Sequence, residues 1–476
     1  SNVLDHPTAQ CRKLGECLQK GATFHHAGLV AGQRKLIEDA FRKGLIKVIC
    51  ATPTLAAGVN LPAYRVIVKD MRRFESFRGM DYIPVLEIQQ MMGRAGRPQY
   101  DTEGEAILIA GTEMEAKKLW NMYITGEPED IVSKLGMEPV LRTHVLSLIA
   151  TGGVSTKESL LEFFGKTFYA HQYKDMTALE RVVDSVLGTL RRFGFVEDAL
   201  GKEKDSDALG GFVRASALSC GEKEELRATK IGKRVAELYI DPLSANHMIK
   251  GLSKMKEEGK ESELSVMHVL SGCLEMKPGL SLRKKDVDAG KGGENGETLS
   301  SFMVQYNGHL VGRIPTEWEL DYEDFMRALK LARLLSEWIE EKGEDSILED
   351  FGVTPGELRA RIEISDWLFY SMQELCLLLG MRDMMAAVRR ARIRVKYGIK
   401  AELLPLVKLK GIGRVRARSL YNNGYRTLES LRGAPLTSLA NILGPNIAKD
   451  VQRQLSGPVA SEDKWEQETI ADSTGD

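Results

Sequence analysis

The stretch Gln90-Met-Met-Gly-Arg-Ala-Gly-Arg-Pro98 determines how the rest of this sequence is interpreted. Its two arginines, Arg94 and Arg97, stand three residues apart, and a glycine precedes each of them. On one helical face such a pair can clamp a polyphosphate, because a guanidinium is always charged and its donors match phosphate oxygens. The run is equally compatible with an arginine-rich surface turn, so it needs support from elsewhere in the chain.

Two preceding stretches provide this support. Ala51-Thr-Pro-Thr-Leu-Ala-Ala-Gly-Val-Asn-Leu-Pro62 lies between two predicted strands, and Thr23-Phe-His-His-Ala-Gly-Leu29 closes an earlier one. Hydroxyls and a glycine at the carboxyl end of a parallel strand lie where α/β sheets bind their ligands. His25 and His26 are adjacent on a strand, so their side chains diverge and a shared metal ion is not expected.

The strands are predicted from short β-rich runs. Residues 3 to 125 alternate helical patterns with these runs, which are Lys47–Ala51, Arg65–Val68 and Glu105–Ile109. Strands that helices cover on both faces have such a composition. We therefore expect a parallel α/β sheet in this part of the chain.

In chain order, the three stretches resemble motifs IV, V and VI of superfamily-two helicases. Their residues are similar to those of the Ski-two-like branch. Over nearly the whole chain, the sequence resembles the archaeal DNA repair helicases related to the helicase part of DNA polymerase theta. The resemblance implies a multidomain α/β plus α fold. Its expected parts are a second RecA-like motor domain (3–128), a winged helix (129–240), a helical ratchet bundle (241–393), a helix-hairpin-helix unit (394–456) and a polar tail (457–476).

The resemblance also implies roles for single residues around a bound nucleotide. Arg94 and Arg97 reach its phosphates, and Arg97 is the arginine finger that stabilises charge on the transferring phosphoryl group. The other expected members are Gln90, which positions the nucleotide, Gly58 and Asn60, which line the same cleft, and Thr52, which contacts the DNA backbone.

Two motifs of such enzymes are missing from this sequence. It holds no Gly-x-x-x-x-Gly-Lys-Ser/Thr loop and no Asp-Glu box for magnesium. The chain also opens on Ser1-Asn2 rather than on Met. We expect a C-terminal fragment that does not hydrolyse ATP alone, with most ligands of ATP and Mg²⁺ supplied by a first RecA-like domain.

The interval from Asp70 to Tyr82 mixes basic and aromatic residues around Gly79. In the family this interval holds a β-hairpin that separates the strands of a duplex, and a phenylalanine can stack on the last base pair. An ordinary surface hairpin is the alternative. The DNA-binding candidates here are Arg72, Arg73, Phe74 and Phe77.

A long helix is predicted to begin at Thr354, because Thr354, Pro355 and Glu357 form a capping box with proline at the first position. Gly380 ends it. The apolar residues that fall on one face at helical spacing are Leu358, Ile362, Phe369, Met372, Cys376 and Leu379.

Trp367 lies about 140° from Ile362 around this helix, beside the small residues Ala360 and Ser371. Its indole must pack on another helix or meet a ligand. The resemblance favours a DNA base, since the family's ratchet helix presents a tryptophan and an arginine to single-stranded DNA. Arg359 and Arg361 are both candidates for the arginine.

The C-terminal part carries the most basic segment. From Arg382 to Arg426 there are 13 lysines and arginines against Asp383 and Glu402. Within it, Leu406–Ala417 fits a helix-hairpin-helix, in which a glycine turn brings backbone amides close to a phosphate at a helix N-terminus. A plain glycine helix cap is the alternative. The DNA-binding candidates here are Gly411, Gly413, Arg414, Arg416 and Arg418. In the winged helix, a helix over Val182–Phe193 and a strand over Gly194–Glu197 leave Arg191 and Arg192 as weaker candidates.

Composition excludes several other classes of protein. The chain has 476 residues, 43% hydrophobic and 28% charged, with a net charge of −1, which is typical of a globular protein. No apolar run reaches the roughly 18 residues of a membrane helix, and no signal peptide is evident, so we expect a cytoplasmic protein without a membrane partner. The six scattered cysteines predict reduced core thiols and no metal site: Cys11, Cys17, Cys50, Cys220, Cys273 and Cys376.

The expected function is that of an ATP-dependent DNA helicase. By resemblance it is a monomer that moves 3′ to 5′ on single-stranded and forked DNA during fork repair or recombination, with replication or repair proteins as possible partners. An RNA helicase of the same branch is one alternative. A nucleic-acid-binding scaffold with a degenerate motor is another, against which the intact Gln90, Arg94 and Arg97 argue.

Overall fold

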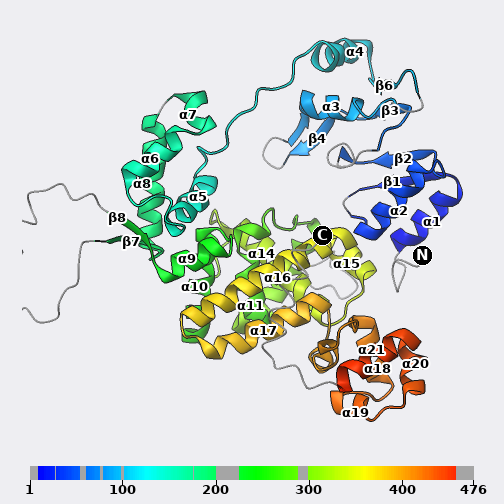
Figure 1. Ribbon diagram of the computed structural model, residues 1–476, viewed down its shortest axis with the longest axis vertical. Helices are drawn as coiled ribbons and strands as arrows, with labels where there is room; N and C mark the ends of the chain where they lie inside the picture. The colour runs from blue at the N-terminus through cyan, green and yellow to red at the C-terminus, as the bar shows by residue number, and fades with distance from the viewer. Residues whose placement is uncertain are drawn as a thin grey trace, which may run out of the picture. The chain divides into compact units, whose positions relative to one another are not determined.

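The computed structural model describes residues 9–26, 28–53, 61–75, 79–97, 101–174, 176–199, 225–287 and 298–456 (Figure 1). The chain forms two compact units. The first unit comprises Ser1–Lys134, Phe168–Lys174 and Val353–Arg359, and the second comprises Leu135–Thr167, Asp175–Gly352 and Ala360–Asp476. None of the described helices is long and apolar enough to cross a membrane.

The first unit contains the predicted parallel strands. β1 (Ala22–His25) pairs with β2 (Val48–Ala51), and β3 (Arg65–Val68) pairs with β6 (Glu105–Leu108), both in parallel. The three predicted strand runs are thereby confirmed to within a residue at each end. The helices of this unit are α1 (Ala9–Gln19), α2 (Ala31–Arg42), α3 (Val85–Met92), α4 (Glu113–Leu119), η2 (Trp120–Ile124) and α7 (Phe168–Tyr173).

Each parallel pair has its own small core. Around β1 this core comprises Leu14, Leu29, Ile37 and Ile46, and around β3 it includes Ile88 and Tyr123. The expectation that helices cover both faces of the strands is wrong for the described chain. Val48 is 53% exposed and Ile67 is 56% exposed, because successive strand residues point to opposite faces and helices pack on one of them.

The second unit begins with three helices and a β-hairpin. The helices α5 (Glu138–Ala150), α6 (Lys157–Gly165) and α8 (Met176–Arg192) precede β7 (Val196–Ala199) and β8 (Glu225–Ala228), which pair antiparallel, and α9 (Lys230–Glu237) follows. The predicted helix thus starts six residues earlier, at Met176, and the predicted strand begins two residues later, at Val196. A Cβ on Gly232 would lie 1.9 Å from the carbonyl oxygen of Phe195, so α9 packs directly on the backbone beside β7.

A helical bundle follows, which belongs to the same unit except for the start of α16, up to Arg359. Its main helices are α10 (Pro242–Glu258), α11 (Glu263–Ser271), α13 (Leu299–Gln305), α14 (Tyr322–Ile339), α15 (Glu344–Phe351), α16 (Pro355–Leu378) and α17 (Arg382–Tyr397). Short turns are η4 (Leu274–Met276), α12 (Lys284–Val287) and η5 (Asn307–His309). The stretch Lys284–Gly296, whose Asp, Gly and Lys residues suggest a loop, begins with the helical turn α12, and its remainder lies outside the described residues.

Helix α16 begins as predicted. The backbone N–H of Thr354 donates to Glu357 Oε2 at 2.8 Å, and the N–H of Glu357 donates to Thr354 Oγ1 at 3.4 Å, which confirms the capping box. The predicted single apolar face is too narrow, because the helix packs on more than one side. Ile362 and Leu379 are half-buried, and the fully buried residues also include Ser365, Leu368, Ser371 and Leu375.

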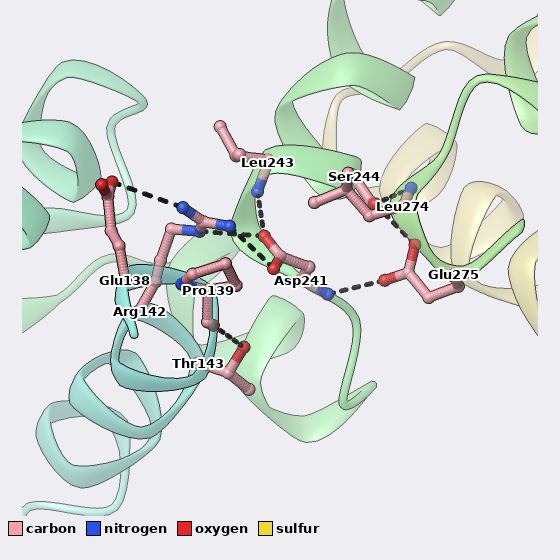
Figure 2. Close-up of polar contacts among 9 residues, drawn as sticks. All are labelled: Glu138, Pro139, Arg142, Thr143, Asp241, Leu243, Ser244, Leu274 and Glu275. Atoms are coloured by element: carbon pink, nitrogen blue, oxygen red, sulfur yellow. Dashed lines mark hydrogen bonds and ion pairs between the residues drawn. The ribbon is translucent and has the colours of Figure 1, made fainter. Parts of the chain in front are cut away.

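A polar network connects α5 to this bundle (Figure 2). The Arg142 guanidinium donates through Nε and Nη2 to both carboxylate oxygens of Asp241, at 3.0 and 2.9 Å. Asp241 also caps α10 by accepting the N–H of Leu243 at 2.7 Å. Its own N–H donates to Glu275 at 2.8 Å, and Glu275 accepts the Ser244 hydroxyl at 2.5 Å. The Asp241 carboxylate thus links α5 to α10, and the Glu275 carboxylate links α10 to η4.

The C-terminal segment has a separate core of small helices. They are η6 (Ala401–Leu403), η7 (Leu406–Lys408), α18 (Arg414–Asn422), α19 (Leu428–Arg432), α20 (Leu436–Leu443) and α21 (Pro445–Ser456). Gly411 adopts φ +84°, which favours glycine, and Gly413 is the N-cap of α18. Gln454 exchanges two hydrogen bonds with the backbone of Lys410, at 2.8 and 3.1 Å, and so fixes this turn.

The five described cysteines are free thiols. Cys273 and Cys376 are buried, and burial raises the pKa of Cys376 to about 12. Cys50, however, is exposed on β2, so the expectation of a core thiol is wrong there. Cys220 lies outside the described residues.

Candidate functional site

The carboxyl ends of β1 and β2 meet in the first unit. The N–H of Thr52 donates to the carbonyl oxygen of His25 at 3.2 Å, which joins two of the three stretches singled out in the sequence. His25 is buried, with Nε2 at 3.3 Å from Glu38, whereas His26 Nδ1 accepts the N–H of Gly28 at 3.0 Å. The two imidazoles thus have separate partners.

The third stretch lies beside the exit of the second. Ala63 and Ala95 form a parallel bridge, in which the N–H of Ala63 donates to the Arg94 carbonyl at 2.9 Å and the N–H of Gly96 donates to the Ala63 carbonyl at 2.7 Å. Gln90 is exposed on the last turn of α3. Gly58 and Asn60 lie outside the described residues.

The two arginines of this stretch do not share a helical face, and that prediction is wrong. Helix α3 ends at Met92 with Gly93 as its C-cap, so Arg94 and Arg97 both follow the helix. Gly96 has φ +89°, a conformation that disfavours other residues and breaks any helix. The chain therefore leaves the helix before Arg94, and no helix joins Arg94 to Arg97 in the described residues.

Arg97 is paired with Asp101, a residue outside the motifs of the sequence. Its Nε and Nη2 donate to the two oxygens of Asp101 at 2.7 and 2.8 Å. The hydrogen bonds from Arg97 hold the pKa of the Asp101 carboxyl below its usual range. The spacing of four residues was visible in the sequence, but it identifies a pair only within a helix.

The interval after Asp70 forms the expected antiparallel hairpin of β4 (Arg72–Glu75) and β5 (Gly79–Tyr82). Arg72 donates to the Tyr82 hydroxyl at 2.8 Å, which lowers the pKa of Tyr82, and Lys118 lies 4.3 Å from the centre of the same ring. Arg73 forms an ion pair with Glu87 at 2.6 Å. Phe77 and the side chain of Phe74 lie outside the described residues.

Trp367 is half-buried on α16, and its indole Nε1 donates to the carbonyl oxygen of Leu238 at 3.0 Å. The two candidate arginines differ in their surroundings. Arg361 donates to the carbonyl oxygens of Met276 and Pro278, at 3.0 and 2.8 Å, whereas Arg359 is exposed. Arg361 thus helps to anchor α16.

The arginines after Gly413 are not equivalent. Arg414 lies 4.7 Å from the centre of the Trp338 ring and donates to the Lys342 carbonyl at 2.9 Å. Arg418 donates to Glu341 and Glu402, both at 2.9 Å. Arg416 donates to the nearby Gly411 carbonyl at 3.0 Å. Arg191, in the helix α8, pairs with Asp198.

Acidic residues from distant helices offset part of the basic segment. Glu263 of α11 pairs with Arg390 and Arg394, and Asp366 of α16 pairs with Arg392 and Lys396. Counting charges between Arg382 and Arg426 therefore overestimates the positive charge that this segment presents, because the partners lie elsewhere in the sequence.

Two parts of the chain match models of known helicase domains. Residues 4–99 match the helicase conserved C-terminal domain, and residues 264–398 match domain 4 of archaeal helicases. The chain is 39% identical over 461 residues to the ATP-dependent DNA helicase Hel308 of Pyrococcus abyssi, and 37% identical over 463 residues to that of Methanocella arvoryzae. The chain is a homologue of the archaeal Hel308 helicases.

The alignments cover 96% of this chain and 58% of each of these two Hel308 relatives. A third relative, the Hel308 of Pyrobaculum calidifontis, is 36% identical over 93% of the chain. The match to the helicase C-terminal domain gives the first unit a RecA-like fold, while the described chain as a whole is mostly helical with small sheets.

Proposed function

We propose that this chain carries the second motor domain and the DNA-handling domains of an ATP-dependent DNA helicase that moves 3′ to 5′ on single-stranded DNA at forks and recombination intermediates. The observation that carries the proposal is the Ala63–Ala95 bridge, which brings Arg94 and Arg97 beside the end of the second sequence motif. The Hel308 relatives, named as ATP-dependent DNA helicases, support it.

The proposed nucleotide site is one half of a composite site. Arg97 acts as the arginine finger, Arg94 contacts phosphate, and Gln90, Gly58 and Asn60 line the cleft. The sequence has no phosphate-binding loop and no magnesium-binding acidic box, so the remaining ligands of ATP and Mg²⁺ come from another RecA-like domain of the longer protein. Both halves are needed for hydrolysis.

We propose the domain boundaries that the sequence predicts. Residues 3–128 form the motor domain, 129–240 a winged helix, 241–393 the ratchet bundle and 394–456 a helix-hairpin-helix unit. The winged-helix proposal is supported by the order of α5, α6, α8 and the β7–β8 hairpin. The helix-hairpin-helix proposal is supported by Gly411 and Gly413, which form the turn before α18.

The proposed contacts with DNA are based on the surroundings of each candidate residue in the structure. Trp367 stacks on a base, which is worth about 1–3 kcal/mol per base. Arg359 is its partner, because the Arg361 guanidinium already binds two backbone carbonyls. Thr52 and the β4–β5 hairpin contact the strand and the fork. Arg416 is the arginine best placed to contact phosphate at the terminal hairpin.

DNA-stimulated ATP hydrolysis tests the proposal. We expect the chain, joined to the phosphate-binding domain of its longer protein, to hydrolyse ATP faster with single-stranded DNA than without it or with RNA of the same sequence. The chain by itself is expected to bind DNA without hydrolysis. Hydrolysis by the isolated chain, or stimulation by RNA alone, would refute this function.

A further inference from the structure

Arg97 is held in place by a compact set of contacts to one carboxylate. Besides the two side-chain hydrogen bonds, the backbone N–H of Arg97 donates to Asp101 Oδ2 at 3.0 Å, and the N–H of Asp101 donates to the Arg97 carbonyl at 2.8 Å. The two residues are thus joined in both directions, through backbone and side chain. Their relative orientation leaves little freedom.

The two partners differ in how far they are covered. The side chain of Asp101 is 9% exposed, whereas that of Arg97 is 46% exposed. The carboxylate is therefore the covered member of the pair, and the guanidinium extends into solvent from it. If Asp101 were only part of an ordinary surface ion pair, its side chain would not be less exposed than that of Arg97.

The backbone around the pair is also fixed by close packing. Gly96 has φ +89°, and a Cβ on Gly104 would lie 2.4 Å from the Gly96 nitrogen. The segments on either side of Arg97 and Asp101 thus approach each other more closely than side chains would allow. The Ala63–Ala95 bridge fixes the preceding residue of the same segment.

The chemistry of the pair suits a phosphate-directed arginine. A carboxylate that accepts from Nε and Nη2 fixes the plane of the guanidinium, whose opposite edge carries further donors in the fork that matches phosphate oxygens. An arginine that is oriented before the reaction needs no reorganisation when charge develops on the transferring phosphoryl group.

We propose that Asp101 is the positioning residue for Arg97, holding its guanidinium in the orientation needed at the nucleotide. The inference rests on the proposed function of Arg97 and adds a residue to it. Asp101 acts through Arg97 and touches no substrate. The opposing hypothesis is a resting-state lock, in which Asp101 must release Arg97 before hydrolysis.

The test compares Asp101→Asn, Asp101→Glu and Arg97→Ala in the helicase that includes its phosphate-binding domain. We expect Asp101→Asn to lower kcat for ATP by about 10- to 100-fold, the cost of a small misplacement, with KM changed less than about threefold. Asp101→Glu should recover part of kcat. Asp39→Asn, which removes the exposed pair with Arg42 on α2, is the matched control and should change neither constant.

A double variant separates positioning from any independent effect. Arg97→Ala with Asp101→Asn should be no slower than Arg97→Ala alone, because groups that act as a unit are not additive. A second measurement uses this chain without ATP. The Nε–H proton of Arg97, assigned by its loss in Arg97→Ala, should exchange slowly in wild type and rapidly in Asp101→Asn.

The outcomes distinguish a failure of the positioning role of Asp101 from a failure of the proposed function of Arg97. An Asp101→Asn helicase with wild-type or higher kcat, or an Nε–H proton whose exchange is unchanged, overturns the positioning role, and a higher kcat supports the lock. If Arg97→Ala itself hydrolyses ATP at the wild-type rate, the proposed function of Arg97 is wrong and the inference falls with it.

Discussion

Replacing Arg142 by Met should destabilise the second unit by about 3 kcal/mol. The Arg142 side chain is 3% exposed and that of Asp241 is 14% exposed, so Arg142→Met leaves a nearly buried carboxylate without its bidentate partner. Breaking such a pair costs about 3–5 kcal/mol. Because Asp241 keeps its hydrogen bond from the Leu243 N–H and some solvent access, we expect the lower end of that range.

The same arginine provides the control. Its other partner, Glu138, is 47% exposed and lies 3.5 Å away, so this ion pair is worth at most about 0.5 kcal/mol. Urea unfolding followed by circular dichroism should therefore separate Arg142→Met from Glu138→Gln by more than about 2 kcal/mol, and hydrogen exchange of the α5 amides should locate the loss. Equal effects of the two substitutions would refute the reasoning.

Three further predictions concern other parts of the second unit. Burial lowers the pKa of His268 from 6.5 to about 4, so below pH 6.5 the unfolded state binds a proton that the folded state does not. The free energy of unfolding should therefore be highest above pH 6.5 and fall by up to about 3 kcal/mol as the pH drops towards 4. Urea unfolding at pH 7, 6 and 5 should show this slope, and His268→Gln should remove most of it. Trp367→Ala should weaken single-stranded DNA binding by about 1–3 kcal/mol in fluorescence anisotropy, with Trp367→Phe intermediate; equal affinity for all three proteins would contradict stacking. Gly232→Ala should lower the free energy of unfolding by about 1–3 kcal/mol, because its Cβ would meet the Phe195 carbonyl. Gly188→Ala, with open space around it, is the control and should raise the free energy of unfolding by about 0.5–1 kcal/mol. Thermal unfolding compares the two variants, and a Gly232→Ala protein as stable as wild type would refute the packing argument.

Local patterns in the sequence predicted those strands and helix caps that depend only on neighbouring residues. The runs Val48–Ala51 and Arg65–Val68 form strands because their β-branched residues favour extended backbone. The capping box of Thr354 and Glu357 needs only residues three apart, and the structure confirms it. Such features follow from one short window of sequence, so their prediction required no knowledge of the tertiary fold.

The errors in this stretch arose where helical spacing was assumed. A shared helical face was expected for Arg94 and Arg97, but α3 ends at Met92, before both of them. Gly96 has a left-handed φ, and the backbone of Arg94 and Gly96 is hydrogen-bonded to Ala63. The pairing of Asp101 with Arg97 was not predicted either, because a separation of four residues indicates a side-chain pair only within a helix.

The candidate DNA-binding arginines show a related limit. In sequence, Arg359 and Arg361 are equivalent neighbours of Trp367. In the structure, the carbonyl oxygens of Met276 and Pro278 accept hydrogen bonds from Arg361, and these acceptors lie more than 80 residues away. Backbone acceptors leave no signature in a sequence, because every residue has a carbonyl group.

The contacts of α16 explain why the network in Figure 2 matters for the ratchet proposal. Within the second unit, α16 donates hydrogen bonds to the end of α9, through the Leu238 carbonyl, and to η4, through the Met276 carbonyl. Asp241 follows the first segment, and Glu275 belongs to the second. Their hydrogen bond therefore ties together the two supports of the helix that carries Trp367. Because Arg142 of α5 binds the carboxylate of Asp241, α5 is connected to both supports through one largely buried ion pair. The orientation of the Trp367 indole thus depends on residues far from α16 in sequence.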